Sequence, residues 1–168
     1  ILAGVTSIEH GTFMNDEDRE LAKKYGTYLV PTIIAGKSVS DSAKVPGYFP
    51  AVIARKAVEV GTQIQDNFGK SYKAGVKIAF GTDAGVYPHG KNYMEFQYMV
   101  EAGMPPMEAI KSATVNAADL LGITNQTGSI VKGKFADIVA VDGDPLVDIK
   151  AMKNMAFVMK EGKIYTNQ

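Results

Sequence analysis

Apolar and polar positions follow two kinds of pattern over the first 125 residues. β-branched and aromatic residues concentrate in three short segments, which predicts strands at residues 5–9, 27–34 and 76–80. The segments between them carry apolar residues at helical spacing, which predicts helices. Strands that alternate with helices are typical of a parallel sheet or barrel, so we expect an α/β fold here.

Two of the predicted helices are well delimited. The first follows Asn15, a good N-cap, and closes at Gly26, with acidic residues in its first turn and lysines in its last. The second spans residues 51–74 and has one apolar face. That face comprises Ile53, Ala57, Val60, Ile64, Phe68 and Tyr72.

Shorter helices are predicted at residues 93–102, from the Pro105-Pro106 pair onward, and at 116–121. Residues 36–50 are predicted to be a loop, because glycines and prolines interrupt them at both ends. A loop of this length is either a functional lid or a mobile surface insertion, and the sequence leaves both open.

The pattern changes near Thr127. Strands are predicted at residues 128–131 and 137–141, followed by a hairpin formed by residues 156–159 and 163–165. We therefore divide the chain into an α/β part, residues 1–125, and a small β part, residues 126–168.

Composition narrows the range of functions. The chain has 168 residues, with 18 Lys plus Arg against 18 Asp plus Glu, so charge gives no reason to expect nucleic acid or an anionic membrane as a partner. No apolar run approaches the roughly 20 residues that span a bilayer. There is no cysteine, which excludes disulfides and thiolate metal sites. This fits a reducing compartment such as the cytoplasm, although many periplasmic proteins also lack cysteine.

The first residues read as the end of a missing element. Leu2 and Ala3 resemble the last turn of a helix and Gly4 its cap, but the helix itself is absent. We expect a truncated chain, although a trimmed tag or a short natural terminus would look the same.

His10 and Asp83 are the candidates for chemistry. Each follows directly on a predicted strand and has a glycine close by. In a βα barrel the carboxyl ends of the strands share one face, where active sites form. An imidazole and a carboxylate there could share a divalent metal such as zinc. The alternatives are a hydrogen-bonded histidine and an aspartate that caps the next helix.

Several motifs, in their order, carry a resemblance to a known family. They are Ser-Ile-Glu-His-Gly-Thr at 7–12, Tyr-Leu-Val-Pro-Thr at 28–32, Gly-Thr-Asp-Ala-Gly-Val-Tyr-Pro-His-Gly at 81–90, Ala-Thr-Val-Asn-Ala-Ala at 113–118 and Gly-Lys-Phe-Ala-Asp-Ile-Val at 133–139. The chain resembles the C-terminal portion of the amidohydrolase superfamily, in its imidazolonepropionase-like and Xaa-Pro dipeptidase branch.

The resemblance implies a fold and a site. Residues 1–125 would form strands six to eight of a TIM-like barrel, and the tail would be one segment of a small β-sandwich. His10 would be a metal ligand, and Asp83 both a ligand and the group that takes a proton from the attacking water. The metal would be divalent, with zinc favoured, and the complete enzyme would hold one or two.

The resemblance also suggests residues that contact substrate, a small amide or dipeptide that ends in proline. Tyr28 could bind the substrate carboxylate or only pack inside the barrel. His89 and Asn92 could touch substrate, or the segment around His89 could only shape a turn.

The departure from the family is large, because its other metal ligands are absent and no histidine remains to replace them. We therefore expect a fragment of a metal-dependent hydrolase of carbon–nitrogen bonds that is inactive alone. It should associate with its N-terminal half or with itself, because a half-barrel exposes strand edges. The rivals are a non-catalytic half-barrel that serves as a structural or partner-binding module, and a chain cleaved from a second polypeptide.

Overall fold

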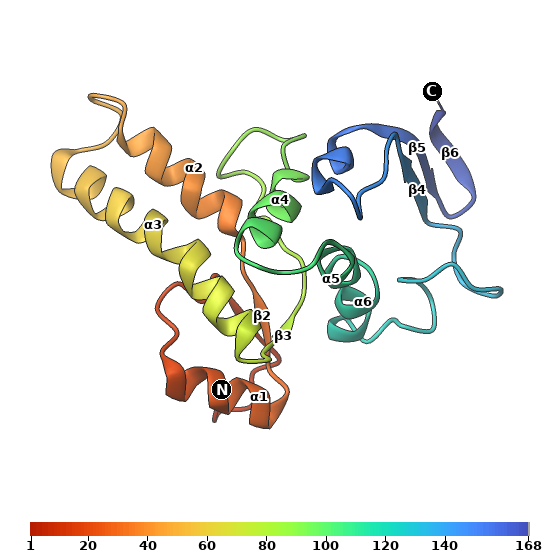
Figure 1. Cartoon of the computed structure of the whole chain (residues 1–168), viewed down its shortest axis with the longest axis horizontal. Coiled ribbons are helices and arrows are strands. Elements are labelled where there is room, and N and C mark those ends of the chain that lie inside the picture. Colours follow the sequence, from red (N-terminus) through yellow and green to blue (C-terminus); the bar gives the residue numbers. More distant parts are fainter. Residues whose placement is uncertain (168) are drawn as a thin grey trace.

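The structure, a computed structural model, describes residues 1–167 and confirms the α/β class. Three short strands, β1 (Ser7–Glu9), β2 (Tyr28–Val30) and β3 (Lys77–Ile78), form one parallel sheet in the order β1-β2-β3. Figure 1 labels β2 and β3 next to each other. All three lie inside the predicted strands. Because the strands are parallel, their carboxyl ends meet at one edge of the sheet.

Helix α1 (Asp16–Tyr25) begins and ends as predicted. The Asn15 side chain accepts a hydrogen bond from the backbone of Asp18, and the Asp18 side chain accepts one from the backbone of Asn15. Gly26 closes the helix in the left-handed conformation. The local signals were therefore sufficient here.

The prediction for residues 36–50 was wrong, and so was the strand assignment of residues 33–34. Helix α2 (Ile33–Ala43) occupies most of that range and packs antiparallel to the long helix α3 (Ala51–Lys73), as Figure 1 shows. A Cβ on Gly61 would lie 2.7 Å from the carbonyl oxygen of Gly36, so the two backbones approach closely. The helix depends on this tertiary contact, which its polar, glycine-containing sequence does not reveal.

Three short helices follow the sheet. They are α4 (Met94–Glu101), α5 (Pro106–Ser112) and α6 (Val115–Leu120), close to the predicted bounds. Among the described residues, no helix has the combination of length and apolar character that a bilayer span requires.

The tail forms a second sheet, with antiparallel strands β4 (Ile138–Val141), β5 (Met155–Lys160) and β6 (Lys163–Asn167). The predicted hairpin is confirmed, but the predicted strand at 128–131 is wrong. Ile130 is 82% exposed and that segment pairs with no strand in residues 1–167. Its β-branched residues therefore lack the ladder that would make them a strand.

The two faces of the parallel sheet differ. Leu29 and Ile78 point toward α1 and α3 and join the main core around Phe68. The opposite face carries a small cluster, Tyr28, Val30 and Ala79, against which Leu120 packs. The 3-10 helix η1 (Ile149–Lys153) packs on α4 and adds Ile149 and Met152 to the main core. The division at residue 125 stays a prediction.

Candidate metal and substrate site

Three side chains meet at the carboxyl edge of the parallel sheet, one after each strand. His10 follows β1, Thr32 follows β2 and Asp83 follows β3. Each has a left-handed backbone, with φ of 66°, 50° and 52°. Among the described non-glycine residues only Glu161 shares this conformation. A left-handed backbone costs a non-glycine residue about 1–3 kcal/mol, and such residues concentrate at functional sites.

His10 and Asp83 line one cavity of about 270 Å³. The rest of its wall is mostly apolar and comes from helices α2 and α3 and from the segment after Asp83. These residues are Ala35, Gly36, Val39, Ala57, Val60, Gly61, Ile64 and Val86, together with Thr12. The side chains of His10 and Asp83 are exposed. The cavity thus combines two polar groups with an apolar wall, as small-molecule sites do.

Thr32 holds the imidazole of His10. Its Oγ1 lies 2.6 Å from Nδ1 of His10, and the His10 backbone N–H donates to the carbonyl oxygen of Val30 at 2.9 Å. Thr32 is 3% exposed, so its hydroxyl is fixed in the interior. No described residue forms a hydrogen bond with Nε2 of His10, which leaves that nitrogen available to a ligand.

Glu95 is a further ionisable residue near this edge, and the sequence analysis did not identify it. Its side chain is completely buried, and its two oxygens accept hydrogen bonds from the backbone N–H groups of Ile33 and Ile34, each at 2.8 Å. Burial raises the pKa of Glu95 to about 7, although both hydrogen bonds favour the ionised form. In the sequence this position is an ordinary glutamate within a predicted helix.

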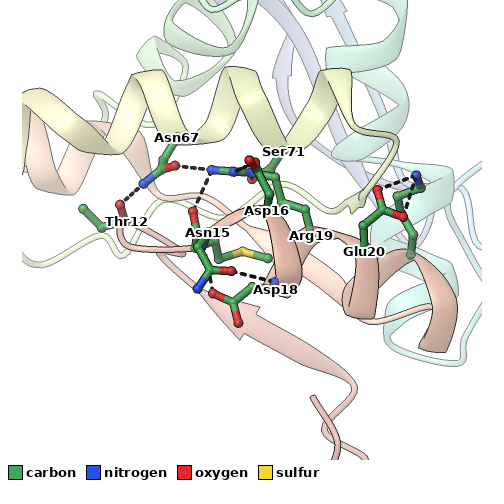
Figure 2. A network of polar contacts seen from close by, with 10 residues as sticks. Thr12, Asn15, Asp16, Asp18, Arg19, Glu20, Asn67 and Ser71 are labelled. Atoms are coloured by element: carbon green, nitrogen blue, oxygen red, sulfur yellow. Dashed lines mark hydrogen bonds and ion pairs between the residues drawn. The ribbon is translucent and has the colours of Figure 1, made fainter.

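Arg19 fixes the segment that follows His10 (Figure 2). Its guanidinium donates to the carbonyl oxygen of Met14 and to the side chains of Asn67 and Ser71 on α3. Asn67 in turn donates to the carbonyl oxygen of Thr12. Arg19 is 5% exposed, so this network joins α1, α3 and the β1–α1 segment in the interior.

The segment that carries Asp83 is held from two sides. A Cβ on Gly81 would lie 2.3 Å from Cγ1 of Val30, so only glycine lets this segment pass so close to β2. Asn92 donates to the hydroxyl of Thr82 at 3.1 Å, while His89 is exposed. The hydroxyl of Tyr87 is buried and has no hydrogen-bond partner in the described part of the chain.

Tyr28 lies at the other end of its strand. It is the first residue of β2, and its hydroxyl donates to Asp119 at 2.6 Å. Burial, followed by this hydrogen bond, raises the pKa of Tyr28 to about 12. The structure therefore brings His10 and Asp83 together and places His89 and Asn92 in the segments after Asp83, but it separates Tyr28 from them.

The donor set suits a divalent metal but is incomplete. Within residues 1–167 no group of three or more His, Asp or Glu side chains could hold an ion. A catalytic zinc usually has three protein ligands. His10 and Asp83 could supply two such donors, one ring nitrogen and one carboxylate, from the segments after β1 and β3.

Comparison with known proteins places the chain in a family. A profile described as the Amidohydrolase family matches residues 1–165. Ochratoxinase from Aspergillus niger is 35% identical over 173 residues, which cover 98% of this chain and 35% of that protein. An imidazolonepropionase from Flavobacterium johnsoniae is 34% identical over 136 residues, 79% of this chain and 28% of that protein.

Among solved structures, a Xaa-Pro dipeptidase with methionine bound in its active site superposes with a TM-score of 0.96 at 53% identity. The match covers 99% of this chain and 41% of the dipeptidase. The chain therefore spans about two-fifths or less of these three proteins. These findings confirm the resemblance to the imidazolonepropionase-like and Xaa-Pro dipeptidase branch and its C-terminal portion.

Proposed function

The chain belongs to the amidohydrolase family, and we propose that it carries part of the active site of a divalent-metal-dependent hydrolase of carbon–nitrogen bonds. One observation carries the proposal. His10 and Asp83 follow two parallel strands and line one cavity at their carboxyl ends. Active sites of βα barrels form at that edge.

Each residue has a defined role in this proposal. His10 offers Nε2 as a ligand, because its other ring nitrogen is bound to Thr32. Asp83 would be the second residue to hold the ion, and its carboxylate would take a proton from the attacking water and return it to the leaving nitrogen. A divalent ion held there, with zinc favoured, would lower the pKa of the attacking water and polarise the scissile carbonyl.

We assign β1, β2 and β3 to strands six to eight of a TIM-like barrel, and the β4–β6 sheet to a composite β-sandwich. The similarity to a chain of which this one covers 41% supports the assignment. The remaining ligands come from outside these residues. We therefore propose that the 168-residue chain alone binds metal weakly and does not hydrolyse dipeptides.

The proposed substrate is a small dipeptide that ends in proline, with cyclic amides as the alternative. The solved Xaa-Pro dipeptidase and the apolar wall of the cavity support a dipeptide with an apolar first residue. His89 and Asn92 lie in the segments after Asp83, which is compatible with contact to substrate. A role for Tyr28 stays a prediction, because Asp119 already binds its hydroxyl.

A chimaeric enzyme tests this function. The segment of the solved Xaa-Pro dipeptidase that the chain matches is replaced by this chain, and hydrolysis of Met-Pro is measured with added zinc. We expect hydrolysis, and a loss of about 100-fold or more in Asp83→Asn, because general acid–base groups contribute about 10²–10⁴-fold. A folded chimaera that is inactive, or a D83N chimaera with full activity, contradicts the proposal.

A further inference from the structure

Helix α2 is capped in an unusual way. Its N-cap residue is Thr32, yet the Thr32 hydroxyl accepts no hydrogen bond from the first turn of the helix. A threonine at this position normally binds the N–H of the second or third helical residue. Here the carboxylate of Glu95 binds the N–H groups of the first and second helical residues, Ile33 and Ile34.

Because Glu95 binds the N–H groups at the start of α2, the Thr32 hydroxyl is free for another partner. Its oxygen lies 2.6 Å from Nδ1 of His10, which is 22 residues away in the sequence. Thr32 also has a left-handed backbone, which the adjoining hydrogen bonds to Glu95 help to hold. The three residues thus form a chain of contacts from α4, through the start of α2, to the imidazole after β1.

We propose that Glu95 is a positioning residue for His10. By capping α2 in place of Thr32, it keeps the Thr32 hydroxyl on Nδ1 of His10 and leaves Nε2 as the unprotonated nitrogen. A hydroxyl can donate or accept, and we assign the direction: the Nδ1–H of His10 donates to Thr32 Oγ1, as a metal-binding histidine donates its other ring N–H to an acceptor. The helix N-terminus, where negative charge is favoured, offsets part of the cost of burying the carboxylate.

The inference rests on the proposed function only for the use of Nε2 as a ligand. The tautomer of His10 is a property of the metal-free chain and can be read without activity. The two histidines also make the measurement simple, because His89 is exposed and serves as an internal reference.

The test is imidazole ¹⁵N NMR of the metal-free chain at about pH 8, above the usual histidine pKa of about 6.5. In the unmodified chain we expect His10 with its proton on Nδ1. In Glu95→Gln the side-chain NH₂ faces one of the two backbone donors, so the Thr32 hydroxyl turns to cap the helix. The His10 signals should then shift to the mixed tautomers shown by His89.

Glu101→Gln is the matched control, because it makes the same chemical change on the same helix at an exposed position. It should leave the His10 signals unchanged. Two variants separate the effect of the Thr32 hydroxyl from an effect on the fold. Thr32→Val removes the hydroxyl, and Thr32→Ser keeps it. The valine variant should release His10 to mixed tautomers, and the serine variant should keep the proton on Nδ1.

Four results would overturn the proposal. They are a His10 proton on Nε2 in the unmodified chain, unchanged signals in folded E95Q, unchanged signals in T32V, and collapse of the E95Q fold, which would make Glu95 a determinant of folding alone. A His10 that behaves as expected but binds no zinc, even in the chimaera, would instead refute the proposed function and leave this inference standing.

Discussion

Glu95 Oε1 lies 2.8 Å from the backbone nitrogen of Ile33, and this contact places a carboxylate in the interior with no ion-pair partner in residues 1–167. Its pKa is raised from 4.5 to about 7 in the folded chain. Between these values the folded state holds a proton that the unfolded state has lost. The free energy of unfolding therefore falls as the pH rises through this window.

The pH dependence is measured by denaturant unfolding of the unmodified chain and of E95Q. The stability of the unmodified chain relative to E95Q should fall by about 3 kcal/mol between about pH 4 and pH 8. The E101Q chain is the control, because it makes the same chemical change at an exposed position of the same helix. A difference that stays constant, or that grows in favour of the unmodified chain as the pH rises, contradicts the raised pKa.

The Arg19 network predicts that Asn67→Ala destabilises the chain. The change leaves a buried guanidinium N–H and the carbonyl oxygen of Thr12 without a partner, at a cost of about 1–3 kcal/mol. Asp16→Ala is the control, because the Asp16 side chain is fully exposed and its ion pair with Arg19 is screened by water. Thermal unfolding that is affected equally by the two changes would speak against the network.

The crossing of α2 and α3 predicts that Gly61→Ala is destabilising, although alanine is the better helix former. The added Cβ would lie 2.4 Å from Cβ of Ser40 and 2.7 Å from the carbonyl oxygen of Gly36. Forcing the helices apart should cost about 1–3 kcal/mol. Thr62→Ala, at an exposed neighbouring position, should not lower the melting temperature. A G61A chain as stable as T62A would refute the close crossing.

Local signals predicted those elements that local interactions specify. Asn15 and Gly26 delimit α1, and Glu161-Gly162 turns the final hairpin, because capping and turn residues act over a few positions. Helix α2 escaped prediction because its stability comes from α3 and its cap from Glu95, 62 residues beyond Ile33. The segment 128–131 was wrongly predicted to be a strand. Its β-branched residues favour a strand locally, but they find no partner strand in the described part of the chain.

The site was predictable in part for the same reason. The position of His10 and Asp83 after strands, together with the family motifs, was enough to bring them to one edge. Thr32 and Glu95 could not be found, because a buried threonine after a strand and a glutamate within a helix look ordinary in sequence. Only the fold shows that Thr32 contacts His10 and that Glu95 caps the helix that begins after Thr32.

The exposed edge of β1 predicts self-association. Within the described residues β1 pairs only with β2, and Val5 and Phe13 beside it are 44% and 67% exposed. Sedimentation at micromolar concentration should show oligomers, and Val5→Lys should weaken them, because a lysine protects a strand edge. A stable monomer under these conditions contradicts this prediction.

In the proposed function, His10 and Asp83 supply two ligands of a divalent-metal site that this chain forms only in part. A zinc titration followed at the ¹⁵N imidazole signals tests it most directly, in the unmodified chain and in Asp83→Asn. We predict a weak, saturable change at Nε2 of His10 that is lost in D83N, with no such change at His89. Tight binding of one zinc per chain, or a His10 response that is absent or unaffected by D83N, would contradict the claim.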